Sequence, residues 1–116
     1  MNGNIFSEIN KLIEKNEIEK AQFKLSNLQN EYTKNPEYLY LRSKIFYLNK
    51  LYYLAIDTLF IALEFEENNK IYFLLSEIYK VLGNRDLGQK MLDKNKRNIA
   101  AKEAKDLMTG LYRKKK

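Results

Sequence analysis

One short pattern occurs three times in this 116-residue chain, at a spacing that few folds can accommodate. Ala21, Ala55 and Gly88 recur at an almost constant interval, each among apolar residues at helical spacing. A period of about 34 residues, as here, is typical of arrays in which helix pairs stack on one another. Small residues at the same point of each unit let the two helices of a pair approach closely. The sequence therefore predicts an all-α fold built from three helix pairs.

The three segments align beyond these small residues. Ser43 aligns with Ser76, and Lys50 aligns with Gly83. The first segment is less similar to the other two, but its apolar and turn positions follow the same spacing, at Leu12, Asn16, Ala21, Leu25 and Leu28. We place the three units at residues 2–35, 36–68 and 69–97.

Apolar residues recur at i, i+3, i+4 and i+7 almost throughout, which favours helices. The pair Asn35-Pro36 indicates a helix boundary, because proline fits the first turn and disfavours helix at the residue before it. Gly83 is a good helix stop, because glycine readily adopts a left-handed conformation. We expect helices at 4–15, 18–31, 36–48, 52–66 and 70–82, and a sixth that begins near Arg85. The aromatic and β-branched residues of 50–63 give a strand some local support, but the helical periodicity on both sides argues against it.

Beyond Lys94 the period stops and a single apolar stripe follows, made of Ile99, Ala100, Ala104, Leu107, Met108 and Leu111. The last unit of an array has no neighbour to cover its apolar face and needs a cap. We therefore expect a capping helix at 98–112, about seven helices in all, one domain over 1–112 and a basic tail at 113–116. One long bent helix in place of the last two is the alternative, because no proline or glycine separates them.

Two segments carry more specific patterns. The second contains Ala55-Ile56, then Ala62-Leu63-Glu64 and Asn68-Asn69, and the third contains Leu75-Ser76, Tyr79 and Gly83. On these residues the chain resembles the tetratricopeptide repeat (TPR) family over about residues 3–95. Gly88 departs from the usual alanine, Leu39 from the usual tryptophan, and Glu67 from a frequent proline. The resemblance implies a right-handed superhelix whose concave groove, lined by the first helix of each unit, binds peptides or partner proteins.

The resemblance also implies which residues face that groove: Phe6, Asn10, Ile13, Glu37, Tyr40, Lys44, Tyr47, Lys70, Phe73, Glu77 and Lys80. This mixture is aromatic and charged. Aromatic side chains offer a large contact area at low rotamer cost, and charges set the register of a bound segment. The alternative is that Phe6, Phe73 and one of the tyrosines only pack between repeats.

One group within the family grips a C-terminal carboxylate with Lys and Asn side chains. Asn10 and Lys70 match that pattern, whereas Phe6, Leu41 and Leu74 occupy the other positions and cannot hold a carboxylate. A partner helix or extended segment with apolar anchors fits these residues better.

The net charge of +6 is concentrated at one end, because residues 94–116 hold nine basic and two acidic side chains. The basic residues there are Lys94, Lys96, Arg97, Lys102, Lys105, Arg113, Lys114, Lys115 and Lys116. Such a run suits contact with phosphate, in nucleic acid or on an anionic membrane. The alternative is a solvated tail that aids solubility, and we favour that interpretation.

Composition argues against catalysis. The chain has no cysteine and no histidine, so the best nucleophile and the commonest general base are missing. Its four glycines form no phosphate loop, and no ligand spacing indicates a metal. We expect no enzyme activity, no cofactor and no metal. With no signal sequence and no apolar stretch long enough to cross a bilayer, we expect a cytoplasmic protein.

The sequence thus favours a protein-interaction adaptor or scaffold that holds a peptide or helix of a partner in its groove. A secretion or assembly chaperone that holds a client segment is the nearest alternative. A self-assembling structural protein is another, because Ile5, Phe6, Ile9 and Ile13 span much of the N-terminal helix and could pack on a second copy. Weak binding of nucleic acid or an anionic surface through the basic C-terminus is the last.

Overall fold

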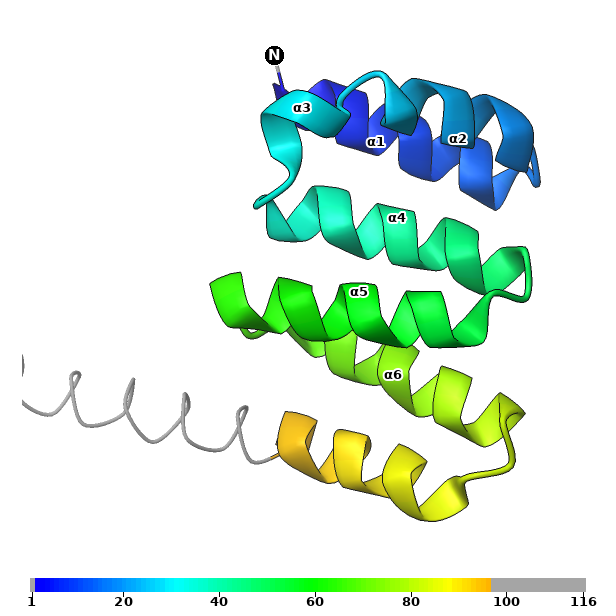
Figure 1. Cartoon of the computed structure of the whole chain (residues 1–116), viewed down its shortest axis with the longest axis vertical. Helices are drawn as coiled ribbons and strands as arrows, with labels where there is room; N and C mark the ends of the chain where they lie inside the picture. The colour runs from blue at the N-terminus through cyan, green and yellow to red at the C-terminus, as the bar shows by residue number, and fades with distance from the viewer. Residues whose placement is uncertain (1, 97–116) are drawn as a thin grey trace, which may run out of the picture.

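A computed structural model describes residues 2–96, and every regular element in that range is a helix. Figure 1 shows the order of these helices along the chain. They are α1 (Asn2–Glu14), α2 (Ile18–Ser26), α3 (Gln29–Tyr32), α4 (Pro36–Leu48), α5 (Tyr52–Phe65) and α6 (Asn69–Val81), followed by helical residues at 85–96. The all-helical class is confirmed for this range. The expected capping helix at 98–112 and the tail at 113–116 lie outside the described residues.

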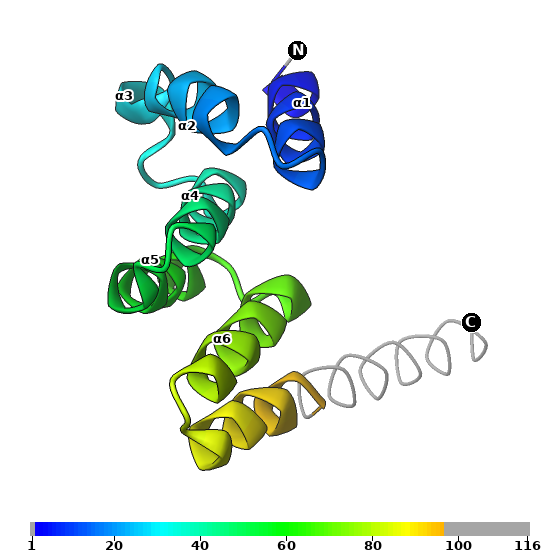
Figure 2. The same ribbon diagram turned by 90° about the vertical axis from the view of Figure 1, so that its right-hand side faces the viewer.

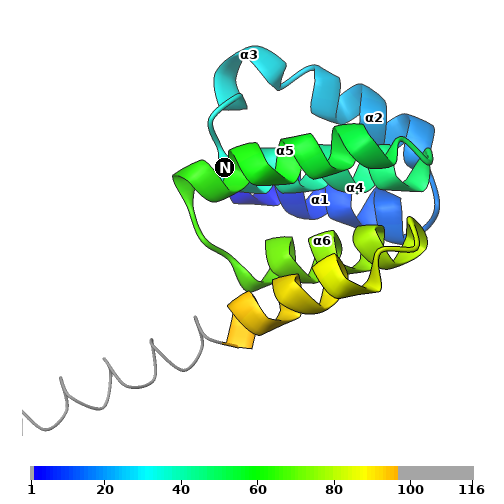
Figure 3. The same cartoon turned by 60° about the horizontal axis from the view of Figure 1, so that its bottom comes forward.

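The helices form consecutive antiparallel pairs. The first pair is α1 with α2, the second is α4 with α5, and the third is α6 with residues 85–96, which lie side by side in Figures 1 and 3. Helix α4 contacts α1, α2, α5 and α6, so it is the centre of the packing. Figure 2 shows α1 and α6 on the same side of the α4–α5 pair.

One predicted helix is wrong. The expected helix at 18–31 is divided into α2 and the single turn of α3. The Ser26 hydroxyl donates to the Phe23 carbonyl at 2.8 Å, and the Leu28 amide then bonds to Leu25 three residues back at 3.0 Å. A serine that bonds to nearby backbone offers the chain an alternative to the α-helical ladder, and the tighter i−3 bond ends the helix.

The same turn closes each pair. Asn16, Lys50 and Gly83 all have positive φ, at 63°, 63° and 83°. At each site that residue's amide bonds to the carbonyl three residues back at 3.0 Å, and the next amide bonds to the carbonyl five residues back at 2.8 Å. This pair of hydrogen bonds around a left-handed residue is the Schellman motif, which satisfies the last carbonyls of a helix. The three turns recur at the same interval as the small residues of the sequence pattern.

Asparagine caps the first helix of the second and third pairs. The Asn35 side chain accepts hydrogen bonds from the amides of Glu37 and Tyr38, at 2.9 and 3.1 Å, and Pro36 follows at the first helical position. The Asn68 side chain accepts from the amide of Lys70 at 2.8 Å. Such caps satisfy amides that have no partner within the helix, so both helices begin where the sequence predicts, within one residue.

The small residues lie where the helices of each pair cross. Ala21 and Ala55 are fully buried, and Gly88 is buried as well. A Cβ atom on Gly88 would lie 3.1 Å from the backbone oxygen of Ser76, so here one helix backbone nearly touches the other. Close approach is therefore the structural role of these three positions.

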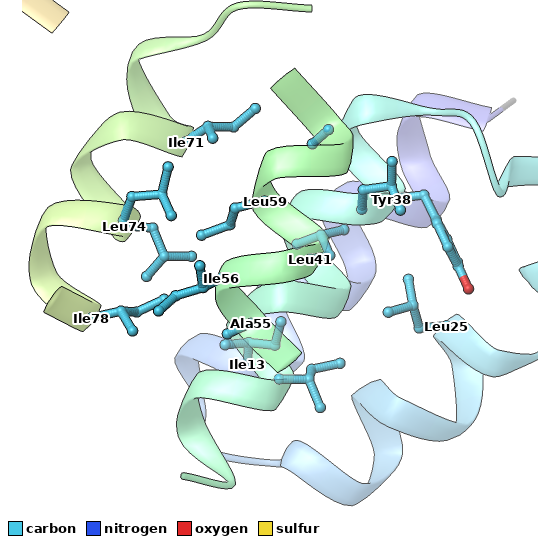
Figure 4. Close-up of a cluster of buried hydrophobic side chains, with 14 of the residues drawn as sticks. Ile13, Leu25, Tyr38, Leu41, Ala55, Ile56, Leu59, Ile71, Leu74 and Ile78 are labelled. Carbon is cyan, nitrogen blue, oxygen red and sulfur yellow. The ribbon is translucent and has the colours of Figure 1, made fainter. Parts of the chain in front are cut away.

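The core is continuous from α1 to α6. Figure 4 shows Ile56 and Leu59 of α5 facing Ile71 and Ile78 of α6. The largest side chains with almost no exposure are Tyr38, Ile9, Leu41, Leu59, Ile71, Leu75 and Ile78. Each fully buried aliphatic side chain contributes about 1.5–3 kcal/mol through removal of its surface from water. This core holds α1, α4 and α6 in fixed positions and so shapes the surface that they form together.

Candidate binding groove

Helices α1, α4 and α6 line two adjoining hollows. The first has a volume of 460 Å³ and is lined by Phe6, Ser7, Asn10, Glu37, Tyr40, Lys44 and Lys70. The second has a volume of 450 Å³ and is lined by Ile13, Glu14, Tyr40, Lys44, Tyr47, Leu48, Lys70, Phe73, Leu74 and Glu77. Because Tyr40, Lys44 and Lys70 belong to both, the hollows form one groove with these three side chains at its centre.

Helical periodicity explains how each helix contributes. Most lining residues of α4 lie three or four positions apart, and the same spacing recurs along α1 and α6. Residues at this spacing share one face of a helix. The opposite face of α4, with Tyr38, Leu41 and Ile45, is buried in the core. The groove face is therefore a fixed surface of three packed helices rather than a loop.

Ten of the eleven residues expected to face the groove line these hollows. The exception is Lys80, whose side chain lies against the helix at 85–96: a Cβ on Gly88 would come within 3.2 Å of its Cγ. Sequence reasoning missed Ser7, Glu14, Leu48 and Leu74. The last three follow Asn10, Lys44 and Lys70 by one helical turn, so a four-residue step along each helix would have found them.

Tyr40 lies between two lysines at the centre of the groove. The Lys44 and Lys70 ammonium nitrogens are 5.6 and 5.9 Å from its ring centroid, within the range of a cation–π interaction. Burial raises the pKa of the Tyr40 hydroxyl, and the nearby Glu37 and Glu77 carboxylates raise it further. Tyr40 is therefore neutral at ordinary pH and presents an aromatic face with a cation on it.

The groove lysines keep charge available for a ligand. Lys44 donates a hydrogen bond to Asn10 Oδ1 at 3.2 Å, which joins α4 to α1, and Asn10 donates in turn to Glu14 at 3.1 Å. Among residues 2–96, neither Lys44 nor Lys70 forms a salt bridge with a carboxylate. An ammonium group without an ion pair can donate to a carboxylate of a bound segment without first breaking an existing ion pair.

The apolar lining has both buried and exposed parts. Phe6 and Ile13 are 9% and 7% exposed, and the Phe6 ring packs edge-on against Tyr32 with centroids 5.3 Å apart. This contact lies within the first unit, and Phe6 also lines the first hollow. Phe73 is 54% exposed and projects from α6 beside the second hollow. The Tyr47 ring packs against the ring of Tyr52 at the start of α5, with centroids 5.8 Å apart, and this contact holds it in place.

The positions that argue against a carboxylate clamp are filled by core residues. Leu41 is fully buried and Leu74 is 6% exposed. Asn10, which matches the clamp pattern, is already bonded to Lys44 and Glu14. The groove therefore offers the Lys44–Tyr40–Lys70 centre with apolar surface around it.

Other kinds of site find little support in the described part of the chain. Of the predicted basic surface, Lys94 and Lys96 are exposed at the end of the helical residues 85–96, and the other seven residues lie outside the described range. Within residues 2–96 no three acidic side chains gather as metal ligands would. No helix in that range combines the length and the apolar character needed to cross a membrane.

The chain matches no protein-family model, and no curated protein matches its sequence. The class defined here is therefore that of an all-helical protein with a groove across three packed helices. The resemblance to the TPR family stays a prediction.

Proposed function

We propose that this chain is a binding module whose groove holds a segment of a partner protein. The observation that carries the proposal is the position of ten residues from three separate helices along one continuous groove. Concave surfaces with apolar walls and a few well-placed polar groups are the usual ligand sites of proteins. By binding this segment, the chain would connect its partner to other proteins, as an adaptor or scaffold does.

The recurrent geometry supports a TPR-like array as the framework of this module. The same Schellman turn occurs at Asn16, Lys50 and Gly83, and a small residue follows each turn by five positions. In such an array the pairs stack into a right-handed superhelix, and the stripe at 98–112 caps its last pair. Solving the structure of the full chain in solution by NMR tests both features.

The lining indicates the chemistry of the bound segment. Phe73 is half exposed beside the second hollow and offers an anchor for an apolar side chain. Lys44 and Lys70 favour a carboxylate placed next to that anchor. Glu37 and Glu77, on the outer sides of the centre, favour basic residues further along. We infer a helix or extended segment with one apolar anchor and an adjacent acidic residue.

Co-purification with mass spectrometry tests the proposal. Phe73→Ala and Lys70→Glu change exposed groove residues, so both variants should fold as the parent does. Each should weaken capture of the partner by at least about tenfold, because anchors and charge pairs at the centre of an interface carry most of its energy. Phe23→Ala is the matched control, since Phe23 is 68% exposed on α2 and lines neither hollow. Equal capture by the groove variants and the control would contradict the proposal.

The alternatives stay predictions. A secretion or assembly chaperone would use the same groove for an unfolded client, and the same variants should then lose the ability to keep that client from aggregating. Self-assembly through the N-terminal helix was suggested by apolar residues that could pack on a second copy. Phe6, Ile9 and Ile13 are instead buried within the chain. Nucleic-acid or membrane binding depends on residues mostly outside the described range.

A further inference from the structure

The outer face of α5 exposes large apolar side chains that no other described residue covers. Tyr53 is 73% exposed, Leu54 is 48% and Ile61 is 45%. Phe60 and Phe65 on the same helix are 40% and 45% exposed. A surface helix of a monomer normally presents charged and polar side chains outward. Clusters of exposed apolar side chains usually mark an interaction site.

This face is separate from the groove. The inner side of α5, with Ala55, Leu59 and Ala62, is fully buried, and α5 packs against α4 and α6. No residue of α5 lines either hollow of the groove. A partner on the outer face and a segment in the groove could therefore be bound at the same time.

Three charged residues follow one another from the turn before α5 to the end of its outer face. Lys50, Asp57 and Glu64 recur at every seventh position, and all three are exposed. A step of seven is close to two helical turns, so Asp57 and Glu64 lie above one another on α5, while Lys50 precedes the helix in its left-handed turn. This series starts with a cation just before the helix, has an anion in the middle and ends with an anion. When the series is reversed, its cation meets the terminal anion at both ends, whereas the central anion meets the same residue of the second copy.

We propose that two copies of this chain associate through these faces, with their α5 helices antiparallel about a two-fold axis at Asp57. In this register Lys50 of each copy lies opposite Glu64 of the other. Tyr53 lies opposite Ile61 in the same way. A two-fold interface uses the same patch on both copies, so every favourable pair occurs twice.

The available area suits a weak dimer. At about 200 Å² per aromatic side chain, the exposed fractions of Tyr53, Phe60 and Phe65 amount to about 300 Å² in each copy. Two copies supply about 600 Å² from these rings alone, and Leu54 and Ile61 add to it. The total approaches the lower range of specific interfaces, about 1200 Å², where association is reversible and concentration-dependent.

Asp57 sets a limit on the strength of this dimer. Two Asp57 carboxylates approach each other at the axis, and like charges that face each other oppose association. Lys50 and Glu64 act in the opposite sense at both ends of the interface. The register therefore makes a separate prediction for each of three charged residues.

Sedimentation equilibrium of the full chain, from about 1 µM to about 1 mM, tests the dimer. We expect a reversible monomer–dimer equilibrium that Ile61→Glu weakens at least about tenfold. Phe23→Glu is the control, because Phe23 is exposed on α2 rather than α5. A chain that stays monomeric at the highest concentration would overturn the proposal. A dimer that survives Ile61→Glu would overturn it too, and would direct attention to residues 97–116.

Charge reversal tests the register without placing a charge in the apolar patch. Lys50→Glu and Glu64→Lys should each weaken self-association about fivefold, because each variant brings like charges together twice. An equimolar mixture of the two variants should associate as tightly as the parent, since every pair is then opposite in charge. Asp57→Asn should strengthen the dimer severalfold. A mixture no tighter than its components, or weakening by Asp57→Asn, would refute the antiparallel register.

Discussion

The second and third helix pairs have the same turn, but different contacts hold them closed. In the second pair the buried Ser43 hydroxyl donates to the Ala55 carbonyl at 3.1 Å. Ser76 occupies the corresponding position of the third pair and is 1% exposed, yet its hydroxyl has no hydrogen-bond partner among the described residues. Asn95 Oδ1 in the third pair is buried and has no partner within that range either. A buried polar group in this state costs about 1–3 kcal/mol.

Close backbone contact takes the place of that hydrogen bond in the third pair. Gly88 lets the helix at 85–96 approach Ser76 so closely that a Cβ would lie 3.1 Å from the Ser76 oxygen. Ala55 at the corresponding point keeps its methyl group, fully buried. Two pairs with one sequence register can thus be closed either by a hydrogen bond or by shape alone. We expect the third pair to open first, because shape alone leaves two polar atoms unsatisfied.

The largest effect should come from removing one core side chain in each pair. Leu41 and Leu75 are both fully buried, so replacement of either by alanine should cost about 2–5 kcal/mol of local stability. Leu41→Ala should lower hydrogen-exchange protection in all the helices, because α4 contacts α1, α2, α5 and α6. Leu75→Ala should lower it mainly in α6 and 85–96. Equal loss everywhere in both variants would show that the pairs open together.

Exchanging the small residues should cost about 1–2 kcal/mol in either direction. Ala55→Gly removes a buried methyl group and adds backbone freedom to α5. Gly88→Ala gains helix propensity but drives a methyl group into the backbone of α6, 3.1 Å from the Ser76 oxygen. Urea denaturation measures both changes. If Gly88→Ala were stabilising, the backbones of the third pair would not be in close contact.

Replacement of the two serines by alanine should change the free energy of unfolding in different directions. Ser43→Ala should lower the free energy of unfolding by about 1 kcal/mol, since it removes a buried hydrogen bond. Ser76→Ala should leave that free energy unchanged or raise it, because it removes a buried hydroxyl that has no partner among the described residues. Thermal and urea unfolding of the two variants beside the parent provide the comparison. A loss of stability in Ser76→Ala as large as that in Ser43→Ala would remove the distinction between the pairs.

The smallest effect should come from the turns. Lys50 has φ 63°, a left-handed conformation that side chains disfavour, whereas Gly83 adopts φ 83° without that cost. Lys50→Gly should therefore stabilise the protein by less than about 1 kcal/mol. Gly83→Ala should destabilise it by a similar amount, through backbone strain only, because no atom lies within 4 Å of the added Cβ. Calorimetric midpoints check both shifts.

Much of the fold could be predicted from local features of the sequence. The period marked by Ala21, Ala55 and Gly88, the cap at Asn35 and the stop at Gly83 all act within a few residues, and the structure has helices and turns where they predict them. The break after Ser26 could not be seen in this way. It depends on the hydrogen bond from the Ser26 hydroxyl to a backbone carbonyl. The presence of serine does not predict such a break, because serine also occurs within intact helices, as Ser43 does.

The groove was predictable only as far as helical periodicity reaches. The resemblance to the TPR family implied these positions, and ten of them line the hollows because residues three and four apart share a face of a helix. Lys80 obeys the same period but lies a turn too far along α6, where the helix at 85–96 receives its side chain. The outer face of α5 was not recognised at all. Its apolar residues read equally well as core until the structure shows which side faces α4 and α6.

Photo-crosslinking in the living cell is the most direct test of the groove. A photoreactive phenylalanine analogue can replace Phe73, which is 54% exposed at the second hollow, or Phe23, which is 68% exposed outside it. We expect position 73 to form one dominant adduct with a partner protein, and Lys70→Glu in the same chain to abolish it. Position 23 should not form that adduct. The same adduct from both positions, or its persistence with Lys70→Glu, would contradict binding in the groove.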